Sequence, residues 1–288
     1  MYIKGEISPG EVIVASQLTN MIKSPIIKIV NSYYEIKSTN YIKEKFNIEY
    51  KEDKKEKIYF DKIQIRNLSF SYKNNIIFKK ANIDFLKNKK YLIVGKSGEG
   101  KSTLMKILLK ELPYEGSIKI NKELKDISFS SLYDLIVPVF QKTIIFNDSI
   151  DFNIKLNEKS KNNLLDIVKE KTEIKSFQSN RLIEENHKNF STGQMQRIQL
   201  ARAFYRKRNI FILDEAFSSI DYENQLKIEK ELTKINATII NISHRITEKI
   251  VDLYDYVIFV ENNKLNLFGI DEAKKKLEEN GFYEKDNI

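Results

Sequence analysis

A glycine-rich loop between an apolar run and an amphipathic segment is the feature that most restricts how this chain can fold. Residues 95–102 read Gly-Lys-Ser-Gly-Glu-Gly-Lys-Ser and match G-x-x-x-x-G-K-[ST] at every fixed position. Residues 91–94 are typical of a short buried strand, and residues 103–112 repeat apolar side chains at the spacing of one helix face. The pattern predicts a strand, a phosphate-binding loop and a helix, with a Gly/Ser turn before a helix as the alternative that binds nothing.

Each residue type in this loop suits a phosphate group. Glycines let backbone N–H groups turn toward phosphate oxygens, and the start of the following helix adds partial positive charge. Lys101 can reach the β- and γ-phosphates, and the Ser102 hydroxyl can hold Mg²⁺. The candidate nucleotide-binding residues in and beside the loop are Gly95, Lys96, Ser97, Gly98, Glu99, Gly100, Lys101, Ser102 and Thr103.

Two further apolar runs end in residues that can do chemistry. Residues 209–213 precede Asp214 and Glu215, and residues 238–242 precede His244. Because the carboxyl ends of parallel strands face the ligand in α/β sheets, we expect these side chains near the phosphate loop. Asp214 can hold Mg²⁺, Glu215 can orient or deprotonate water, and His244 can act near the transferred phosphate. Acid pairs and single histidines are also common without any function, so the upstream loop carries this interpretation.

Composition restricts the class of protein. The chain has 288 residues, a net charge of +9, no cysteine and two histidines, so disulfides and thiolate metal sites are excluded. Its positive charge is spread along the chain, and the densest run, residues 51–57, mixes both signs, which favours a solvated linker over a nucleic-acid patch. There is no secretory signal pattern, and no stretch approaches the roughly 20 apolar residues of a spanning helix.

The patterns divide the chain into three parts. The spacing of apolar residues in 1–50 predicts a long amphipathic helix that begins near Ser8 and Pro9 and is kinked at Pro25. Residues 51–61 form the charged linker. From residue 62 to about 285, strand and helix signals alternate, which predicts an α/β domain with a mainly parallel sheet.

Residues 190–194, Phe-Ser-Thr-Gly-Gln, resemble the signature motif of ATP-binding cassette (ABC) ATPases, whose usual form is Leu-Ser-Gly-Gly-Gln. The other marks of that family follow in order. Tyr72 resembles the aromatic residue that stacks on adenine, Gln141 the Q-loop glutamine, residues 218–221 the D-loop, and His244 the switch histidine. The resemblance covers residue 62 to about 270. It implies a P-loop NTPase cassette with a mixed, mainly parallel β core and a helical subdomain at about 142–205.

The resemblance also implies roles for single residues, with ATP and Mg²⁺ as cofactors. The implied catalytic groups are Glu215, His244, Gln141 and Lys101; the implied metal ligands are Ser102, Gln141 and Asp214. Family cassettes enclose each ATP between the P-loop of one cassette and the signature of another. The residues implied to complete these nucleotide sites are therefore Tyr72, Ser191, Gly193, Gln194 and Asp221. Thr192 replaces a signature glycine, so we expect a weaker site where this signature is used.

Residues 139–154 resemble the stretch after the Q-loop in exporter-type cassettes, and residues 5–13 with the following helix resemble the last membrane helix of such an exporter. Residues 184–188 keep the Glu of the loop that precedes the exporter signature but lack its Gly. The resemblance implies a second cassette and transmembrane helices as partners, no nucleic acid, and a place at the cytoplasmic face of the membrane through residues 9–46. The exported substrate stays open. We expect the remaining membrane helices to come from another segment or polypeptide.

Two other functions stay open at this point. A soluble ABC ATPase acting on nucleic acid or protein would share the cassette, but such branches generally lack the helix at 9–46, and no basic stripe supports DNA binding. A remnant that binds ATP and a partner without productive transport is the other alternative. Intact Lys101, Asp214, Glu215 and His244 argue against loss of the chemistry.

Overall fold

The computed structural model describes residues 9–46, 55–142, 144–156, 158, 163–174, 177, 182–183 and 189–283. The chain divides into two units, residues 1–53 and 54–288. The first contains α1 (Pro9–Phe46), which continues through Pro25 where the sequence predicts a kink. Proline removes one backbone donor from the helical hydrogen bonds while the rest of the ladder remains. The predicted cap at Ser8 lies outside the described residues.

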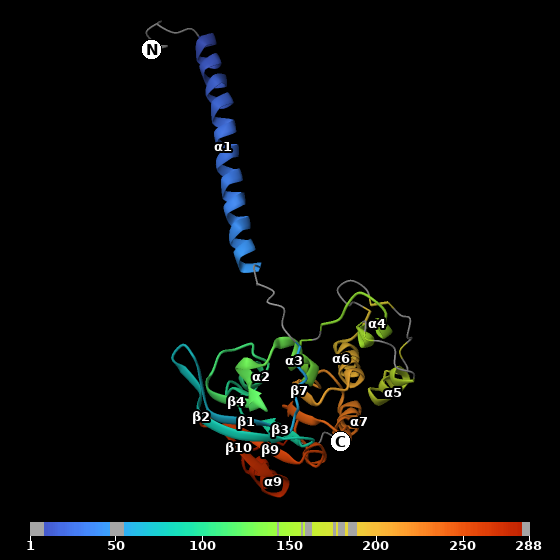
Figure 1. The fold of residues 1–288 in the computed structure, drawn as a ribbon. Helices are drawn as coiled ribbons and strands as arrows, with labels where there is room; N and C mark the ends of the chain where they lie inside the picture. Colours follow the sequence, from blue (N-terminus) through green and yellow to red (C-terminus); the bar gives the residue numbers. More distant parts are fainter. Residues whose placement is uncertain are drawn as a thin grey trace. The chain divides into compact units, whose positions relative to one another are not determined.

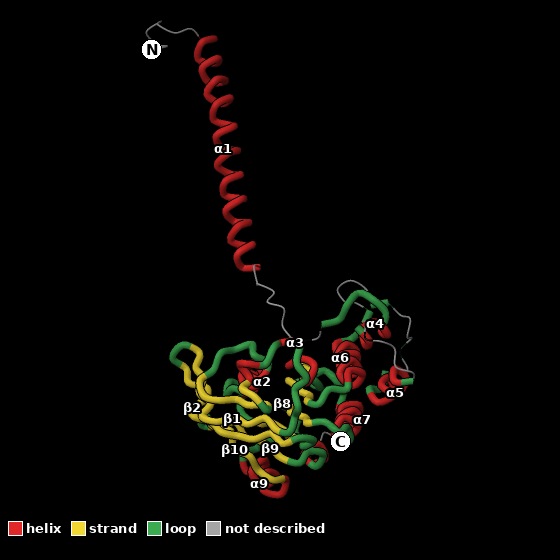
Figure 2. Tube along the Cα trace, in the orientation of Figure 1, coloured by secondary structure: helices red, strands yellow, loops and turns green. Residues whose placement is uncertain are grey.

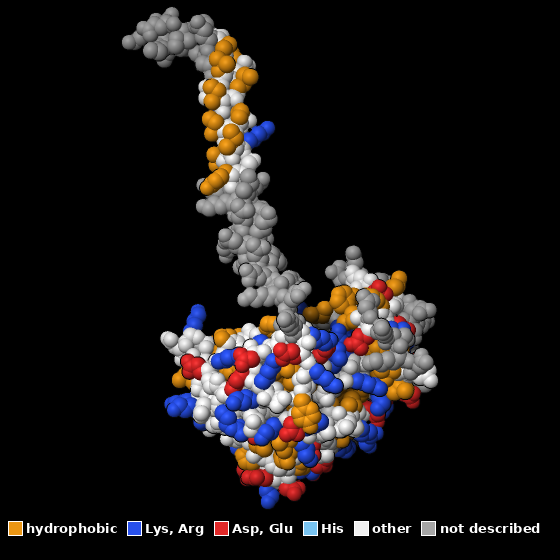
Figure 3. All heavy atoms as spheres, in the orientation of Figure 1, with side chains coloured by type: hydrophobic (Ala, Val, Ile, Leu, Met, Phe, Trp, Pro, Cys, Tyr) orange, Lys and Arg blue, Asp and Glu red, His pale blue; other side chains and the backbone are white. Residues whose placement is uncertain are grey.

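The described side chains of α1 are exposed within this chain, including its large apolar ones. Figure 3 shows apolar side chains along the coloured part of this helix. The exposed large apolar residues of α1 are Ile13, Val14, Leu18, Met21, Ile22, Ile26, Ile27, Ile29, Val30 and Tyr33. No helix in the described ranges combines the length and the apolar character that crossing a membrane requires.

A six-stranded sheet forms the centre of the second unit (Figure 1). The strand order is β10-β9-β3-β8-β7-β6, and all neighbouring pairs are parallel except β10 with β9. The bounds are β3 Lys90–Val94, β6 Ile136–Phe140, β7 Ile210–Asp214, β8 Thr238–Ile242, β9 Tyr256–Glu261 and β10 Lys264–Gly269. The continuous apolar runs form strands because both faces of this sheet are covered. In β7, for example, Ile212 packs into one core cluster and Phe211 into the other.

A second, antiparallel sheet covers one side of this core. Its order is β2-β1-β4-β5, with bounds β1 Lys62–Tyr72, β2 Asn75–Leu86, β4 Glu115–Ile120 and β5 Lys122–Glu123. The alternation seen in the sequence from residue 63 corresponds to buried Ile63 and Ile65 on β1, which share a core cluster with Leu104 of α2 (Lys101–Leu108). The predicted mixed β core is therefore confirmed.

Helices gather between β6 and β7 in the sequence, where a helical subdomain is predicted. This segment contains α4 (Ile150–Lys155), α5 (Leu164–Lys171) and α6 (Thr192–Arg206). Figure 2 shows these three helices beside one another, away from the yellow strands β1 and β2. The other helices are η2 Leu124–Asp126, α3 Phe129–Leu135, α7 Tyr222–Thr233, α8 Glu248–Val251 and α9 Ile270–Glu279. Positive and negative side chains interleave over the face of this unit seen in Figure 3.

Candidate functional site

The predicted phosphate loop lies between β3 and α2, as expected. Gly100 precedes the helix with a φ of 102°, in the left-handed region that favours glycine. A Cβ at this position would lie 2.2 Å from the Ile77 side chain, so the loop can pass over β2 only with glycine here. The backbone geometry therefore requires glycine at position 100, which is one of the two fixed glycines of the motif.

Lys101 turns its ammonium group back over the loop. Its Nζ donates to the carbonyl oxygens of Gly95 at 2.7 Å and Lys96 at 2.9 Å. The side chain is buried, and this desolvation lowers the pKa of Lys101 although nearby carboxylates act to raise it. The ammonium group is thus held within the loop that is predicted to cradle phosphates.

Ser102 joins the loop to the end of β7. Its hydroxyl donates to Asp214 Oδ1 at 3.0 Å. Burial raises the pKa of Asp214, and the hydrogen bond from Ser102 acts in the opposite direction. Two predicted metal ligands that lie 112 positions apart in the sequence are therefore in direct contact.

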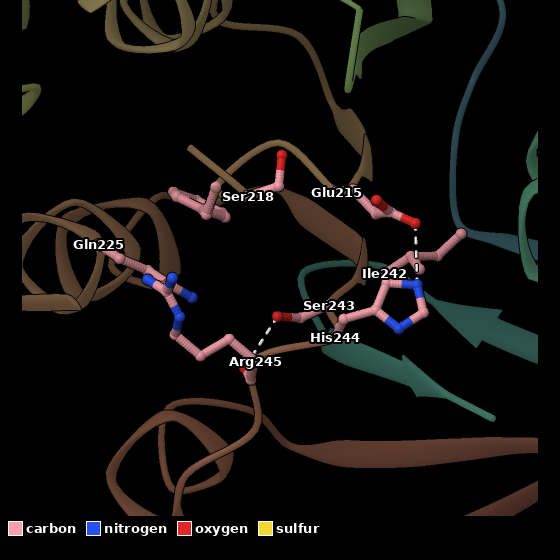
Figure 4. Close-up of a pocket in the computed structure, with 8 residues that line it drawn as sticks. Glu215, Ser218, Gln225, Ile242, Ser243, His244 and Arg245 are labelled. Carbon is pink, nitrogen blue, oxygen red and sulfur yellow. Dashed lines mark hydrogen bonds and ion pairs between the residues drawn. The ribbon is translucent and has the colours of Figure 1, made fainter. Parts of the chain in front are cut away.

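Glu215 is the centre of a second set of contacts. Gln141 Nε2 donates to Glu215 Oε2 at 2.7 Å, and His244 Nε2 lies 2.8 Å from Glu215 Oε1 (Figure 4). Glu215 has a φ of 52°, an uncommon value for a residue other than glycine, and its N–H donates to the Ile242 carbonyl. This turn carries the carboxylate beyond the strand to the two predicted partners.

A contact that the sequence did not predict ties the histidine segment to the D-loop. The Arg245 guanidinium donates to the Ile220 carbonyl at 2.8 Å and to Gln225 Oε1 at 3.1 Å. Ser243 Oγ donates to the Arg245 carbonyl, and Figure 4 shows the Arg245 and Gln225 side chains pointing toward one another. Gln225, Ser243 and Arg245 line a cavity of about 130 Å³ that also reaches Glu215. The only sequence signal for Arg245 is that an arginine stands directly after the predicted switch histidine.

The signature residues begin α6. Ser191 is the N-cap, and its hydroxyl accepts from the Gln194 N–H while the Gln194 side chain accepts from the Ser191 N–H. A Cβ on Gly193 would lie 2.4 Å from the Ser219 carbonyl oxygen, so glycine lets the helix approach the D-loop. Thr192 is the first helical residue and is exposed. The signature is therefore a helix start packed against the D-loop of the same chain.

Gln196 strengthens that packing in a role that the sequence did not predict. Its amide nitrogen donates to Ser218 Oγ at 3.0 Å, and its amide oxygen accepts from the Ser219 N–H at 2.8 Å. Gln196 is buried and lies in helical register with Leu200 and Ala203, which are apolar. A polar residue in the buried register of a helix is the signal that could have identified it.

The remaining predicted residues lie apart from these contacts. Tyr72 is 44% exposed and packs edge-on against Phe70, with a ring-centre distance of 4.8 Å. Asp221 is the N-cap of α7 and accepts from the N–H and side-chain amide of Asn224, which lowers the pKa of its carboxyl group. Asp221 therefore caps a helix, and neither Tyr72 nor Asp221 takes part in the contacts around Glu215. Residues 184–188 lie outside the described residues.

The side chains around the loop suit a magnesium ion that is shared with phosphates. Among the described residues, no group of three or more His, Asp and Glu side chains could hold a metal ion. Mg²⁺ is commonly held by one or two protein oxygens together with substrate phosphates, so a complete protein cluster is not needed. The Ser102 hydroxyl and the Asp214 carboxylate provide that kind of oxygen ligand beside the loop.

Comparison with known proteins agrees with this arrangement. Residues 78–218 match the family model for the ABC transporter. The microcin-J25 export ATP-binding/permease protein McjD of Escherichia coli is 39% identical over 197 residues, which are 64% of this chain and 34% of that protein. The lactococcin-A transport/processing ATP-binding protein LcnC of Lactococcus lactis subsp. lactis is 29% identical over 99% of this chain and 42% of its own length.

The fold is found in solved exporter structures as well. A bacterial Atm1-family ABC exporter with ATP bound superposes with a TM-score of 0.69 over 77% of this chain and 41% of that chain, at 22% identity. The chain spans between about a third and two fifths of the length of the curated relatives named above. The family match, the loop contacts and the shared fold together show that this chain belongs to the ABC transporter family and contains its ATP-binding domain.

Proposed function

We propose that this chain is the ATP-hydrolysing part of an ABC exporter and that ATP joins two such cassettes head to tail. The observation that carries the proposal is the position of Glu215, whose two carboxylate oxygens contact Gln141 and His244. The contact of Ser102 with Asp214 supports it by linking the phosphate loop to the same strand end. Phosphoryl transfer to water needs positioned groups and stabilised charge, and this arrangement provides both.

In this proposal each residue has a defined task, and Gln141 has two. Tyr72 stacks on adenine, and Lys101 with the N–H groups of the loop binds the phosphates. Glu215 orients and deprotonates the attacking water, while Gln141 and His244 hold the carboxylate in place. Ser102, Gln141 and Asp214 hold Mg²⁺, which neutralises charge on the phosphates when it is bound.

The signature residues serve the nucleotide of a second cassette. Ser191 and Thr192 are exposed at the start of α6, where backbone N–H groups and the helix dipole favour an anion. ATP between two cassettes then acts as a ligand that favours the closed dimer, and ATP hydrolysis lets the dimer open. Asp221 contributes from the adjoining D-loop, where it caps α7.

The partner of the cassette in transport is a set of membrane helices. Residues 1–50 correspond in this proposal to the end of an exporter membrane domain, joined by the linker at 51–61 to the cassette at 62–285. The alignment with LcnC covers 99% of this chain, so the similarity extends over the N-terminal segment as well as the cassette. The chain then acts at the cytoplasmic face of a membrane through residues 9–46, which the exposed apolar side chains of α1 support.

Steady-state ATP hydrolysis by the full chain tests the proposal. Glu215→Gln keeps the side-chain size and removes the carboxylate, so we expect hydrolysis to fall by about a hundredfold or more while ATP binding persists. Glu279→Gln is the matched control, because Glu279 is exposed on α9. Normal turnover by Glu215→Gln would overturn the catalytic assignment. A chain that stays monomeric with and without ATP would overturn the proposal that two cassettes share each ATP site. A chain that does not fractionate with membranes would overturn the proposed location at the membrane.

A further inference from the structure

The phosphate loop contains a carboxylate of its own. Glu99 occupies one of the four variable positions of the motif, and its side chain folds back across the loop. Its Oε2 accepts from the Lys96 N–H at 2.9 Å, and its own N–H donates to the Lys96 carbonyl at 3.4 Å. One backbone donor of the loop is therefore bonded to a negative charge from the same chain.

Gly95 allows the carboxylate to take this position. The Glu99 Oε2 atom lies 2.8 Å from the place where a Cβ on Gly95 would stand. Any larger residue at position 95 would meet this oxygen and the Val260 carbonyl. The carboxylate thus lies closely against the start of the loop and is only partly accessible to solvent.

The carboxylate also acts on the lysine of the loop. Burial lowers the pKa of Lys101, and among the carboxylates that raise it Glu99 has the largest effect, ahead of Glu215 and Asp214. The Lys101 ammonium group is held by two carbonyl oxygens of this loop. Glu99, Asp214 and Glu215 thus place three carboxylates around Lys101, while Lys96 of the loop and Lys106 of α2 add positive charge nearby.

We propose that Glu99 sets the nucleotide preference of this site by repelling polyphosphates in proportion to their negative charge, so that the site favours the magnesium complex over metal-free nucleotide. A fixed charge interacts with each ligand charge, and its effect grows with the number of charges on the ligand. Mg²⁺ cancels part of the phosphate charge, and the repulsion from Glu99 falls with it. This proposal rests on the proposed function, since it concerns the same ATP site.

Binding measurements on the full chain can separate charge from shape. Glu99→Gln keeps an oxygen that can accept from the Lys96 N–H, whereas Glu99→Asp keeps the charge on a shorter side chain. Dissociation constants are measured for ATP and ADP, each with excess Mg²⁺ and with EDTA, for both variants and the wild type. Glu279→Gln controls for the change in net charge, because that residue is exposed on α9.

The expected result is a graded gain in affinity. Glu99→Gln binds metal-free ATP about tenfold tighter and the magnesium complex about threefold tighter than the wild type, and both gains shrink in high salt. Metal-free ADP gains less than metal-free ATP, while Glu99→Asp and Glu279→Gln stay close to the wild type. Equal gains with and without Mg²⁺, or no gain at all, would overturn this proposal while leaving the ATPase function intact. A wild-type chain that binds neither nucleotide in either condition would overturn the proposed function, and this proposal with it.

Discussion

The Glu215 Oε1 atom lies 2.8 Å from His244 Nε2, although the two residues follow different strands. The register of the parallel sheet explains this contact. Phe140 pairs with Asp214, and Asp214 pairs with Ile242, so Gln141, Glu215 and the segment that holds His244 all leave the sheet at the same edge. The parallel register brings three strand ends together, and side chains from those ends meet at one carboxylate.

Removing the histidine should therefore affect catalysis more than binding. We expect His244→Ala to lower ATP hydrolysis by about a hundredfold, because Glu215 loses one of its two positioning contacts. ATP affinity should change by less than about threefold, since the phosphate loop is separate from this contact. Turnover and equilibrium binding, measured on the same preparation, check this. Loss of both in parallel would show that His244 contributes to binding or folding instead.

Gly193 should be needed for the packing of α6 on the D-loop. Gly193→Ala places a Cβ 2.4 Å from the Ser219 carbonyl oxygen, and we expect the free energy of unfolding to fall by about 1–3 kcal/mol. Urea denaturation measures this change. Gly269→Ala is the matched control, because a Cβ at that position meets no atom within 4 Å and its φ of −68° suits any residue. Equal stability of the two variants would contradict the packing role.

Thr192 should weaken the site that its signature completes. We expect Thr192→Gly to raise both the rate of ATP hydrolysis and the fraction of ATP-dependent dimer, because glycine allows the closest backbone approach to a phosphate. Thr192 is exposed at the first turn of α6, so the cost of glycine to helix stability is at most about 1 kcal/mol. Thr192→Ser serves as the control that keeps the hydroxyl. If Thr192→Gly leaves the hydrolysis rate and dimer fraction unchanged, the expectation is wrong.

The buried carboxyl group of Glu229 should make stability depend on pH. Burial raises its pKa from 4.5 to about 8, despite hydrogen bonds to Oε1 from Asn241 Nδ2 at 3.0 Å and the Tyr254 hydroxyl at 3.3 Å. Between these two values the unfolded chain releases the proton and the folded chain keeps it. The free energy of unfolding of the wild type therefore falls as pH rises through this interval, by about 1.4 kcal/mol per pH unit, and levels off above the folded pKa.

Glu229→Gln removes this titration and stays neutral in both states. We expect the variant to gain stability relative to the wild type as pH is raised from 5 to 8, as measured by urea denaturation at several pH values. Asn241, Tyr254 and Gln225 face the group, and Arg245 acts on it as a nearby positive charge. Wild-type and variant stabilities that change in parallel with pH would contradict the assignment of this proton to Glu229.

Much of the site was predictable because its chemistry lies in short segments. The loop at 95–102 has a pattern in which each position has its own physical reason, and apolar runs before Glu215 and His244 mark buried strands. Their contacts with Ser102, Gln141 and one another follow once the strands are parallel neighbours. The long helix predicted for residues 1–50 corresponds to α1, which continues through Pro25, and the kink at this proline stays a prediction.

The amino-acid sequence by itself determined the class of fold, the phosphate loop and the residue types at the strand ends, because these depend on periodicity and on motifs of a few residues. Only the tertiary structure decided that Arg245 bonds to the Ile220 carbonyl, that Gln196 bonds to Ser219 and that Glu99 folds back onto Lys96. Two of these contacts join residues 23 and 25 positions apart, and the third depends on the backbone path of a glycine loop. Such contacts form where the folded backbone brings two atoms within hydrogen-bonding distance, and a pattern along the sequence does not contain the distances between residues in space.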